Sequence, residues 1–261
     1  MADPKDYAGY VDTQYLALAA EYARQDKELS YAAMRVQPGF RVLDVGCGPG
    51  SDTITRAGLV GETGMVTGID YDREILAEAD RRAAEAGVAG RVRHLQADAA
   101  ALPFEANTFD ASRSERLFQH VADPAAVLAE ILRVTRPGGW VVVLETDYAT
   151  LSIDSVETDI ERRLARAAAE RVRSGYAARR LARLFRQSGL EGVSVEVRPQ
   201  QFSSYAIARV GWLDAVEPLA LANKLVTQEE LDRWHRSLEQ IEQAGAFFAT
   251  LNHNLVAGRK P

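Results

Sequence analysis

The sequence predicts an α/β fold in which helices cover both faces of a mostly parallel sheet, with a helical cap added. Short apolar segments rich in β-branched residues alternate with segments of helical periodicity, as expected for consecutive β-α-β units. Turn sequences such as Pro38-Gly39 and Arg136-Pro137-Gly138-Gly139 separate these segments. With 261 residues, 47% of them hydrophobic, the chain is long enough for one such domain with a cap.

Seven strands are expected, and the last of them is placed at an edge of the sheet. They cover residues 41–45, 65–69, 91–96, 109–113, 140–145, 193–197 and 251–258. Helices are expected at residues 7–36, 51–57, 72–86 and 124–134, and again over the arginine-rich segment and most of 203–250. Asp72 and Asp123 are the expected N-caps of two of these helices, and Pro124 suits the first helical position.

The segments outside the alternating units predict a lid and a cap. We expect residues 1–36 to form an N-terminal helical lid, in which Tyr7, Tyr10 and Tyr15 either face the site or pack. Residues 37–261 form the main domain, with helical cap insertions at about 147–176 and 198–250. The aromatic residues of the cap suit either a pocket for an apolar or aromatic small molecule or the packing of its helices. They are Tyr205, Trp212, Trp234, Phe247 and Phe248.

The charge of the chain argues against a dedicated nucleic-acid binder, because the formal net charge is −6. One segment carries many arginines: Arg162, Arg163, Arg166, Arg171, Arg173, Arg179, Arg180, Arg183 and Arg186. Apolar residues recur between them at helical spacing. The segment therefore forms either amphipathic helices with solvated arginine faces or a surface for a phosphate-bearing substrate or RNA.

Cysteine content and hydropathy predict a cytoplasmic protein. Cys47 is the one cysteine of the sequence, so no internal disulfide can form. The first residues are polar and acidic, unlike a secretory signal, and no apolar run approaches the roughly 20 residues that span a membrane.

A glycine-rich loop follows the first expected strand. The strand Arg41–Val45 leads directly into Gly46, Gly48 and Gly50, and a helix is expected from about Ser51. Glycine lets backbone N–H groups come close to a ligand, so this loop predicts a nucleotide-cofactor site. A dinucleotide fingerprint would need glycine or alanine at the sixth position, where this chain has Ser51 or Thr53.

Six motifs in order along the chain resemble those of class I S-adenosylmethionine-dependent methyltransferases. They are Asp44-x-Gly46-x-Gly48-x-Gly50, Gly68-Ile69-Asp70, Gln96-Ala97-Asp98-Ala99, Phe109-Asp110, Arg136-Pro137-Gly138-Gly139 and Ala257-Gly258-Arg259-Lys260. The match is good over residues 37–146 and looser elsewhere. It is most similar to the branch that holds quinone-biosynthesis and natural-product small-molecule methyltransferases. The resemblance implies a Rossmann-like seven-stranded sheet, S-adenosylmethionine as cofactor and S-adenosylhomocysteine as product.

The resemblance also implies roles for particular residues. Gly46 and Gly48 would approach the methionine end of the cofactor, and Ser114 or Glu115 would lie near the methyl-donor end. The Asp70 carboxylate would accept hydrogen bonds from both ribose hydroxyls. Asp98 and the Ala99 N–H would contact adenine, with Tyr71 beside the ribose or adenine. The alternatives are that Asp70 is solvated, that Asp98 forms a turn and that Tyr71 only packs.

The segment after the fourth strand departs from the family pattern. The family usually has apolar residues there, whereas this chain has Ser112-Arg113-Ser114-Glu115-Arg116. Buried charges of this kind need partners. Arg113 or Arg116 can pair with Glu115 or with Asp110, and the sequence does not choose between them.

The predicted activity is methyl transfer to an oxygen, nitrogen or carbon atom of a small organic metabolite by in-line displacement. His120 is the candidate general base. The alternative is that His120 forms a hydrogen bond that positions the next helix. The adjacent Asp-Asn pair of metal-dependent members is missing after the fifth strand, so no metal is expected. A homodimer is possible. The other readings are an RNA methyltransferase that uses the arginine helices, and a cyclase or binder that keeps the cofactor as scaffold.

Overall fold

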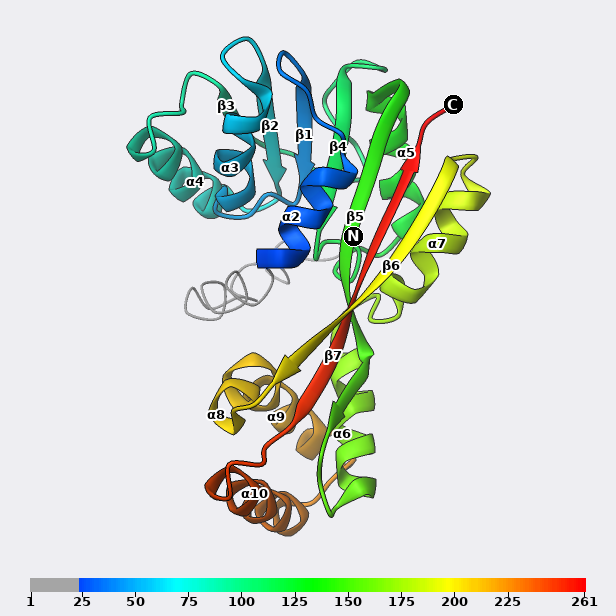
Figure 1. Ribbon diagram of the computed structural model, residues 1–261. Helices are drawn as coiled ribbons and strands as arrows, with labels where there is room; N and C mark the ends of the chain where they lie inside the picture. Colours follow the sequence, from blue (N-terminus) through cyan, green and yellow to red (C-terminus); the bar gives the residue numbers. More distant parts are fainter. Residues whose placement is uncertain (1–23) are drawn as a thin grey trace.

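The computed structural model describes residues 24–261, and the lid tyrosines Tyr7, Tyr10 and Tyr15 lie outside this range. One seven-stranded sheet runs through the described chain in the order β3-β2-β1-β4-β5-β7-β6 (Figure 1). Its strands are β1 Arg41–Val45, β2 Met65–Asp70, β3 Val92–Gln96, β4 Phe109–Glu115, β5 Thr135–Ile153, β6 Glu191–Phe202 and β7 Ala249–Arg259. The first five strands pair in parallel, and β7 pairs antiparallel with both β5 and β6. The predicted α/β fold with a mostly parallel sheet is confirmed.

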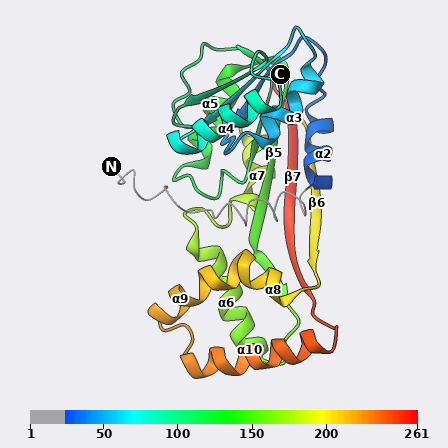
Figure 2. The same ribbon diagram turned by 90° about the vertical axis from the view of Figure 1, so that its left-hand side faces the viewer.

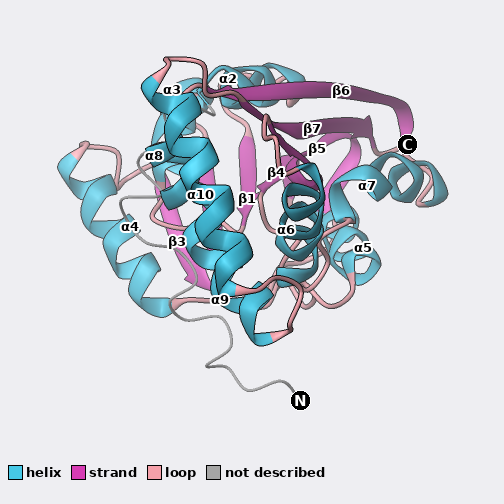
Figure 3. Cartoon of the chain, turned by 90° about the horizontal axis from the view of Figure 1, so that it is seen from below, coloured by secondary structure: helices cyan, strands magenta, loops and turns pink. Residues whose placement is uncertain are grey.

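Helices cover both faces of the sheet because successive strand residues point to opposite sides. The helices beside the sheet are α2 Arg24–Ala33, α3 Ser51–Val60, α4 Arg73–Glu85, α5 Pro124–Val134 and α7 Ala177–Gln187. Leu43 packs in one core with residues of α5 and α7, whereas Val42 packs in another with residues of α3 and α4. Figure 3 shows α3 and α4 on the opposite side of the sheet from α5 and α7. Asp72 and Asp123 cap α4 and α5 through their side chains, as predicted.

The prediction of an edge position for the last strand is wrong. β7 lies between β5 and β6, and its residues from Asn254 to Ala257 are buried. β6 forms the edge instead, and most of its residues are exposed. The charged residues and Pro199 of β6 could have predicted its edge position, since edge strands tolerate proline and charge.

A second lobe lies beyond the carboxyl end of the first four strands. β5 was expected to end at residue 145, but it continues to Ile153, and β6 and β7 extend beside it. Around these extensions pack α6 Thr158–Arg171, α8 Tyr205–Ala208, the π-helix η2 Arg209–Leu213, α9 Asp214–Ala222 and α10 Gln228–Gln243 (Figure 2). Four of the five cap aromatics are buried in the core of this lobe, which agrees with the alternative of helix packing: Tyr205, Trp212, Trp234 and Phe247. Phe248 is exposed. That the lobe covers a substrate stays a prediction.

Candidate functional site

The glycine loop after β1 adopts a conformation that side chains rarely tolerate. Gly46, Gly48 and Gly50 have φ values of 77°, 52° and 76°. The N–H groups of Gly46 and Cys47 donate to the Ile69 carbonyl at 2.8 and 2.9 Å, which fixes the loop against β2. A Cβ added to Gly48 would meet no atom within 4 Å, whereas one at Gly50 would lie 2.9 Å from Ala79. Gly50 therefore serves packing, and Gly48 borders open space where a ligand can approach the backbone.

Asp70 ends β2 directly opposite this loop. Its Oδ2 accepts from the Gly48 N–H at 2.9 Å and its Oδ1 from the Asp72 N–H at 3.1 Å. Burial raises the pKa of this carboxyl above its usual range, although these backbone hydrogen bonds act in the opposite direction. The neighbouring Tyr71 is 44% exposed. A hydrogen bond thus holds Asp70 against the Gly48 backbone at the carboxyl ends of the adjacent strands β1 and β2.

Asp98 and Ala99 follow β3 at the same edge. The Ala97 N–H donates to the Asp70 carbonyl at 3.1 Å, which joins this segment to the end of β2. Asp98 is exposed, and its Oδ1 accepts from the Ala100 N–H at 2.8 Å. This hydrogen bond is typical of an aspartate that forms a turn. The contact of Asp98 with adenine stays a prediction.

Ser114 and Glu115 lie inside β4, not after it, because β4 continues to residue 115 instead of ending at 113. Ser114 is fully buried between Val45 of β1 and Val143 of β5. Within residues 24–261, its Oγ has no hydrogen-bond partner. The Glu115 Oε1 is also buried without a hydrogen bond, although Arg116 Nε lies 3.3 Å away at ion-pair distance. Two polar atoms with unused bonding capacity therefore lie at the carboxyl end of β4, beside the glycine loop.

A buried charge network surrounds Glu115 and decides the pairing that the sequence left open. Arg113 is fully buried, and its Nη2 lies 2.5 Å from Glu115 Oε2. Its Nη1 lies 3.4 Å from Asp52, and its Nε donates to Ser30 Oγ at 2.8 Å. Asp110 pairs instead with Arg136, 2.7 Å away. The charged run in β4 is thus tolerated because each charge has partners.

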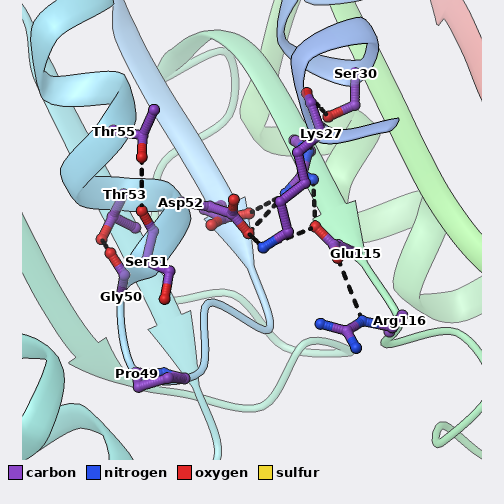
Figure 4. A network of polar contacts seen from close by, with 12 residues as sticks. Lys27, Ser30, Pro49, Gly50, Ser51, Asp52, Thr53, Thr55, Glu115 and Arg116 are labelled. Atoms are coloured by element: carbon purple, nitrogen blue, oxygen red, sulfur yellow. Dashed lines mark hydrogen bonds and ion pairs between the residues drawn. The ribbon is translucent and has the colours of Figure 1, made fainter. Parts of the chain in front are cut away.

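The first described helix, α2, is fastened to this network. Figure 4 shows Lys27 between Asp52 and Glu115, at distances of 3.1 and 3.6 Å from its Nζ. The Tyr31 hydroxyl also donates to Asp52. Burial opposes ionisation of Asp52, but Arg113, Arg56 and Lys27 outweigh it and hold its pKa well below the usual value. Sequence reasoning missed Lys27, Tyr31 and Asp52, because nothing in the local pattern links α2 to α3.

His120 lies in the turn that follows β4. The backbone N–H of His120 donates to the Leu117 carbonyl at 2.8 Å. The imidazole Nε2 of His120 lies 3.0 Å from the side-chain amide nitrogen of Gln119. Burial, Arg171 and Arg116 lower the pKa of His120 to about 4. The imidazole is therefore neutral near pH 7 and has the protonation state that a base needs.

Four of the nine arginines in the arginine-rich segment form ion pairs with acids of the described chain. Arg162, Arg163, Arg166 and Arg179 pair with Glu161, Glu230, Glu170 and Asp147, respectively. These pairs fit the interpretation of amphipathic helices. Across residues 24–261, no three or more histidine, cysteine, aspartate or glutamate side chains gather as a metal site would need. The described helices are also all too short or too polar to cross a bilayer.

Comparison with known proteins supports the predicted resemblance. Residues 42–139 match the family model described as a methyltransferase domain. An uncharacterized 37.1 kDa protein in transposon TN4556 of Streptomyces fradiae is 38% identical over 185 residues, or 70% of this chain and 52% of that protein. A demethylmenaquinone methyltransferase of Bacillus cereus is 42% identical over 118 residues, or 45% of this chain and 49% of that protein. The chain thus spans about half the length of these curated relatives.

The solved structures confirm the fold. The [4+2]-cyclase SpnF superimposes with a TM-score of 0.59 and 24% identity, over 92% of this chain and 82% of that one. At this identity the likeness concerns the fold alone and does not favour cyclisation. The predicted resemblance to methyltransferases is confirmed by the match of residues 42–139 to a methyltransferase domain and by the demethylmenaquinone methyltransferase.

Proposed function

We propose that this chain, whose residues 42–139 match a methyltransferase domain, transfers the methyl group of S-adenosylmethionine to a small organic metabolite. The acceptor atom is an oxygen, nitrogen or carbon. The observation that carries the proposal is the pairing of Gly48 N–H with the Asp70 carboxylate, next to open space at Gly48. S-adenosylhomocysteine is then the product.

The residues at the sheet edge fit the proposed cofactor in kind and in place. Asp70 would hold the ribose, with Tyr71 beside it, and Asp98 and Ala99 would hold the adenine. Gly46 and Gly48 would let the backbone approach the methionine end. There, Ser114 Oγ and Glu115 Oε1 are buried and have no hydrogen bond within residues 24–261. When bound, this cofactor supplies a methyl group activated by a sulfonium leaving group.

The chain's own residues would then orient the acceptor and receive a proton. The buried Arg113 network keeps Glu115 ionised, since Arg113, Arg116 and Lys27 outweigh burial and the nearby Asp52 and lower its pKa. A fixed carboxylate there favours a cationic group at the methyl-donor end. His120 is neutral and can accept a proton from an acceptor whose nucleophilic atom must lose one.

A transfer assay tests this proposal. We expect that label from methyl-tritiated S-adenosylmethionine enters a small-molecule extract and not RNA. The His120→Ala variant should slow turnover by about 100-fold or more, as loss of a general base does, with S-adenosylhomocysteine affinity unchanged. Unchanged turnover would remove His120 as the base.

The same assay separates the alternatives. Transfer of label to RNA, with binding that weakens steeply as salt rises, would replace the small-molecule acceptor by RNA. Cofactor binding without transfer to any extract would instead favour a cyclase or binder that keeps the cofactor as scaffold.

A further inference from the structure

Gln119, which precedes the candidate base in the turn after β4, is held through its backbone and its side chain. Its N–H donates to Glu145 Oε2 at 3.4 Å, and its carbonyl accepts from the Ser174 N–H at 2.8 Å. Its side chain is buried, and the amide nitrogen donates to the Arg116 carbonyl at 3.3 Å. The same nitrogen lies 3.0 Å from the imidazole Nε2 of His120. These contacts place the Gln119 amide directly against the imidazole.

The Arg116 carbonyl decides which way the Gln119 amide points. A carbonyl oxygen only accepts hydrogen bonds, so the NH2 group of the amide, and not its oxygen, must face the carbonyl. Reversing the amide would set two oxygens 3.3 Å apart with no proton between them and would lose this hydrogen bond. Gln119 is therefore the donor in its contact with His120 Nε2.

This donation fixes the tautomer of His120. Burial, Arg171 and Arg116 lower the pKa of His120 to about 4, so the imidazole is neutral at pH 7 and carries one proton. Since Nε2 accepts from Gln119 through its lone pair, that proton lies on Nδ1. A hydrogen bond to the neutral form also opposes protonation, in the same direction as burial and the two arginines.

Four other ionisable groups belong to this turn or act on it. Arg116 lies in the turn and Arg171 ends α6, and arginine stays charged over the whole range studied here. Glu115 ends β4 with its pKa below the usual value, and the pKa of Glu145 on β5 is about 8. Neither carboxyl has its midpoint between pH 5 and 7, so a titration in that range reports His120 itself.

We propose that Gln119 is a positioning residue for His120, which keeps the imidazole proton on Nδ1 and leaves Nε2 as the atom that takes a proton from the methyl acceptor. The inference rests on the proposed function and assigns the base to one nitrogen. In the ligand-free chain the Gln119 N–H occupies the Nε2 lone pair. An O–H or N–H of the acceptor has to take the place of that N–H.

The proton transfer then balances within this turn. The bond between the acceptor atom and its proton breaks as the Nε2–H bond forms, and the freed electron pair makes the new bond to the methyl carbon. His120 becomes an imidazolium and returns its proton to water. The second N–H of the Gln119 amide stays on the Arg116 carbonyl throughout, which keeps the side chain ready to return to Nε2.

Side-chain ¹⁵N NMR of the whole ligand-free chain at pH 7 tests the assignment, with the His120 signals identified by their loss in His120→Ala. We expect a protonated Nδ1 and an unprotonated Nε2. Gln119→Leu removes the donor, so the Nε2–H form should appear and the pKa of His120 should rise by about half a unit to one unit, the value of one neutral hydrogen bond.

Gln119→Glu exchanges the donor for a carboxylate that accepts from Nε2–H. The proton should then move to Nε2, and the pKa of His120 should rise by about one unit or more, since an opposite charge favours the imidazolium. The acidic limb of kcat/KM for label transfer should move up by the same amount. Gln240→Leu, at an exposed position of α10, is the matched control and should leave the tautomer and the limb unchanged.

A wild-type His120 with its proton on Nε2 would overturn the assignment, and so would an unchanged tautomer in both Gln119 variants. An acidic limb that stays in place while the pKa of His120 moves would remove Nε2 as the proton acceptor. These failures are distinguishable from failure of the proposed function, because the tautomer is measured without ligands, whereas cofactor binding and label transfer are measured separately.

Discussion

Glu145 shows at the residue scale how burial changes the chemistry of a side chain. It lies in the middle of β5 with no exposed surface, and the Gln119 and Thr146 N–H groups face its carboxyl at 3.4 and 3.2 Å. Burial outweighs these hydrogen bonds and raises its pKa to about 8. The native state therefore keeps a proton that the unfolded state releases near pH 4.5.

This proton makes stability depend on pH, and the direction follows from linkage. Between about pH 4.5 and 8 the native state binds more protons than the unfolded state, so the free energy of unfolding falls as pH rises. The slope is on the order of 1.4 kcal/mol per pH unit. Glu145→Gln, which cannot ionise, should match wild type near pH 4.5 and exceed its stability increasingly toward pH 8.

Denaturant unfolding at several pH values checks this prediction. The exposed Glu191→Gln serves as control and should keep the wild-type slope. If the Glu145 variant also keeps that slope, the carboxyl is ionised in the native state and the account of its burial fails.

The sequence allowed prediction of site residues that belong to a local pattern. The glycines after β1, Asp70 at the end of β2 and the helix cap Asp72 could be located because each follows from its neighbours in the chain. Arg113 could not be assigned partners, because Asp52 and Ser30 lie 61 and 83 residues away in sequence. Long-range polar pairs leave no periodic signal in one sequence.

At the scale of elements, the turn between α6 and α7 fastens the second lobe to the sheet. The Ser174 backbone in this turn forms a hydrogen bond with the turn that contains His120. The lack of a side chain at Gly175 lets the chain pass close to Ala169 at the end of α6. The position of the last turn of α6 depends on both contacts.

Gly175→Ala should therefore destabilise the fold by at least about 2 kcal/mol, because the added methyl overlaps a backbone oxygen. Gly58→Ala is the matched control in α3, where an added Cβ meets nothing within 4 Å. That change should stabilise the protein by roughly 0.5 to 1 kcal/mol, since alanine loses less entropy in a helix. Thermal and denaturant unfolding measure both, and similar stabilities of the two variants would show that the turn is loosely packed.

The strand errors at this scale have a common cause. The pattern of apolar residues located the seven strands, but it did not show that β5 runs on past residue 145 through polar Thr146 and Asp147. Nor did it give the order of β6 and β7, which depends on tertiary pairing. Periodicity reports which residues are buried, not which strand lies next to which.

At the scale of the whole molecule, three long strands connect two lobes. The glycine loop, Asp70 and the turn after β4 lie at the carboxyl edge of the first lobe, where open α/β sheets bind ligands. The second lobe, built on the extensions of β5, β6 and β7, begins beyond this edge (Figure 2). We expect the acceptor between this edge and the lobe, because His120 follows the carboxyl end of β4 and the lobe begins beyond that end.

Calorimetric titration with S-adenosylhomocysteine tests the central claim most directly. The account predicts binding of one molecule per chain, loss of binding in Asp70→Ala with the fold intact, and wild-type binding in Glu62→Gln, which removes an exposed charge at the far end of β2. Absence of binding by the wild-type chain, together with uptake of a nicotinamide dinucleotide, would contradict it.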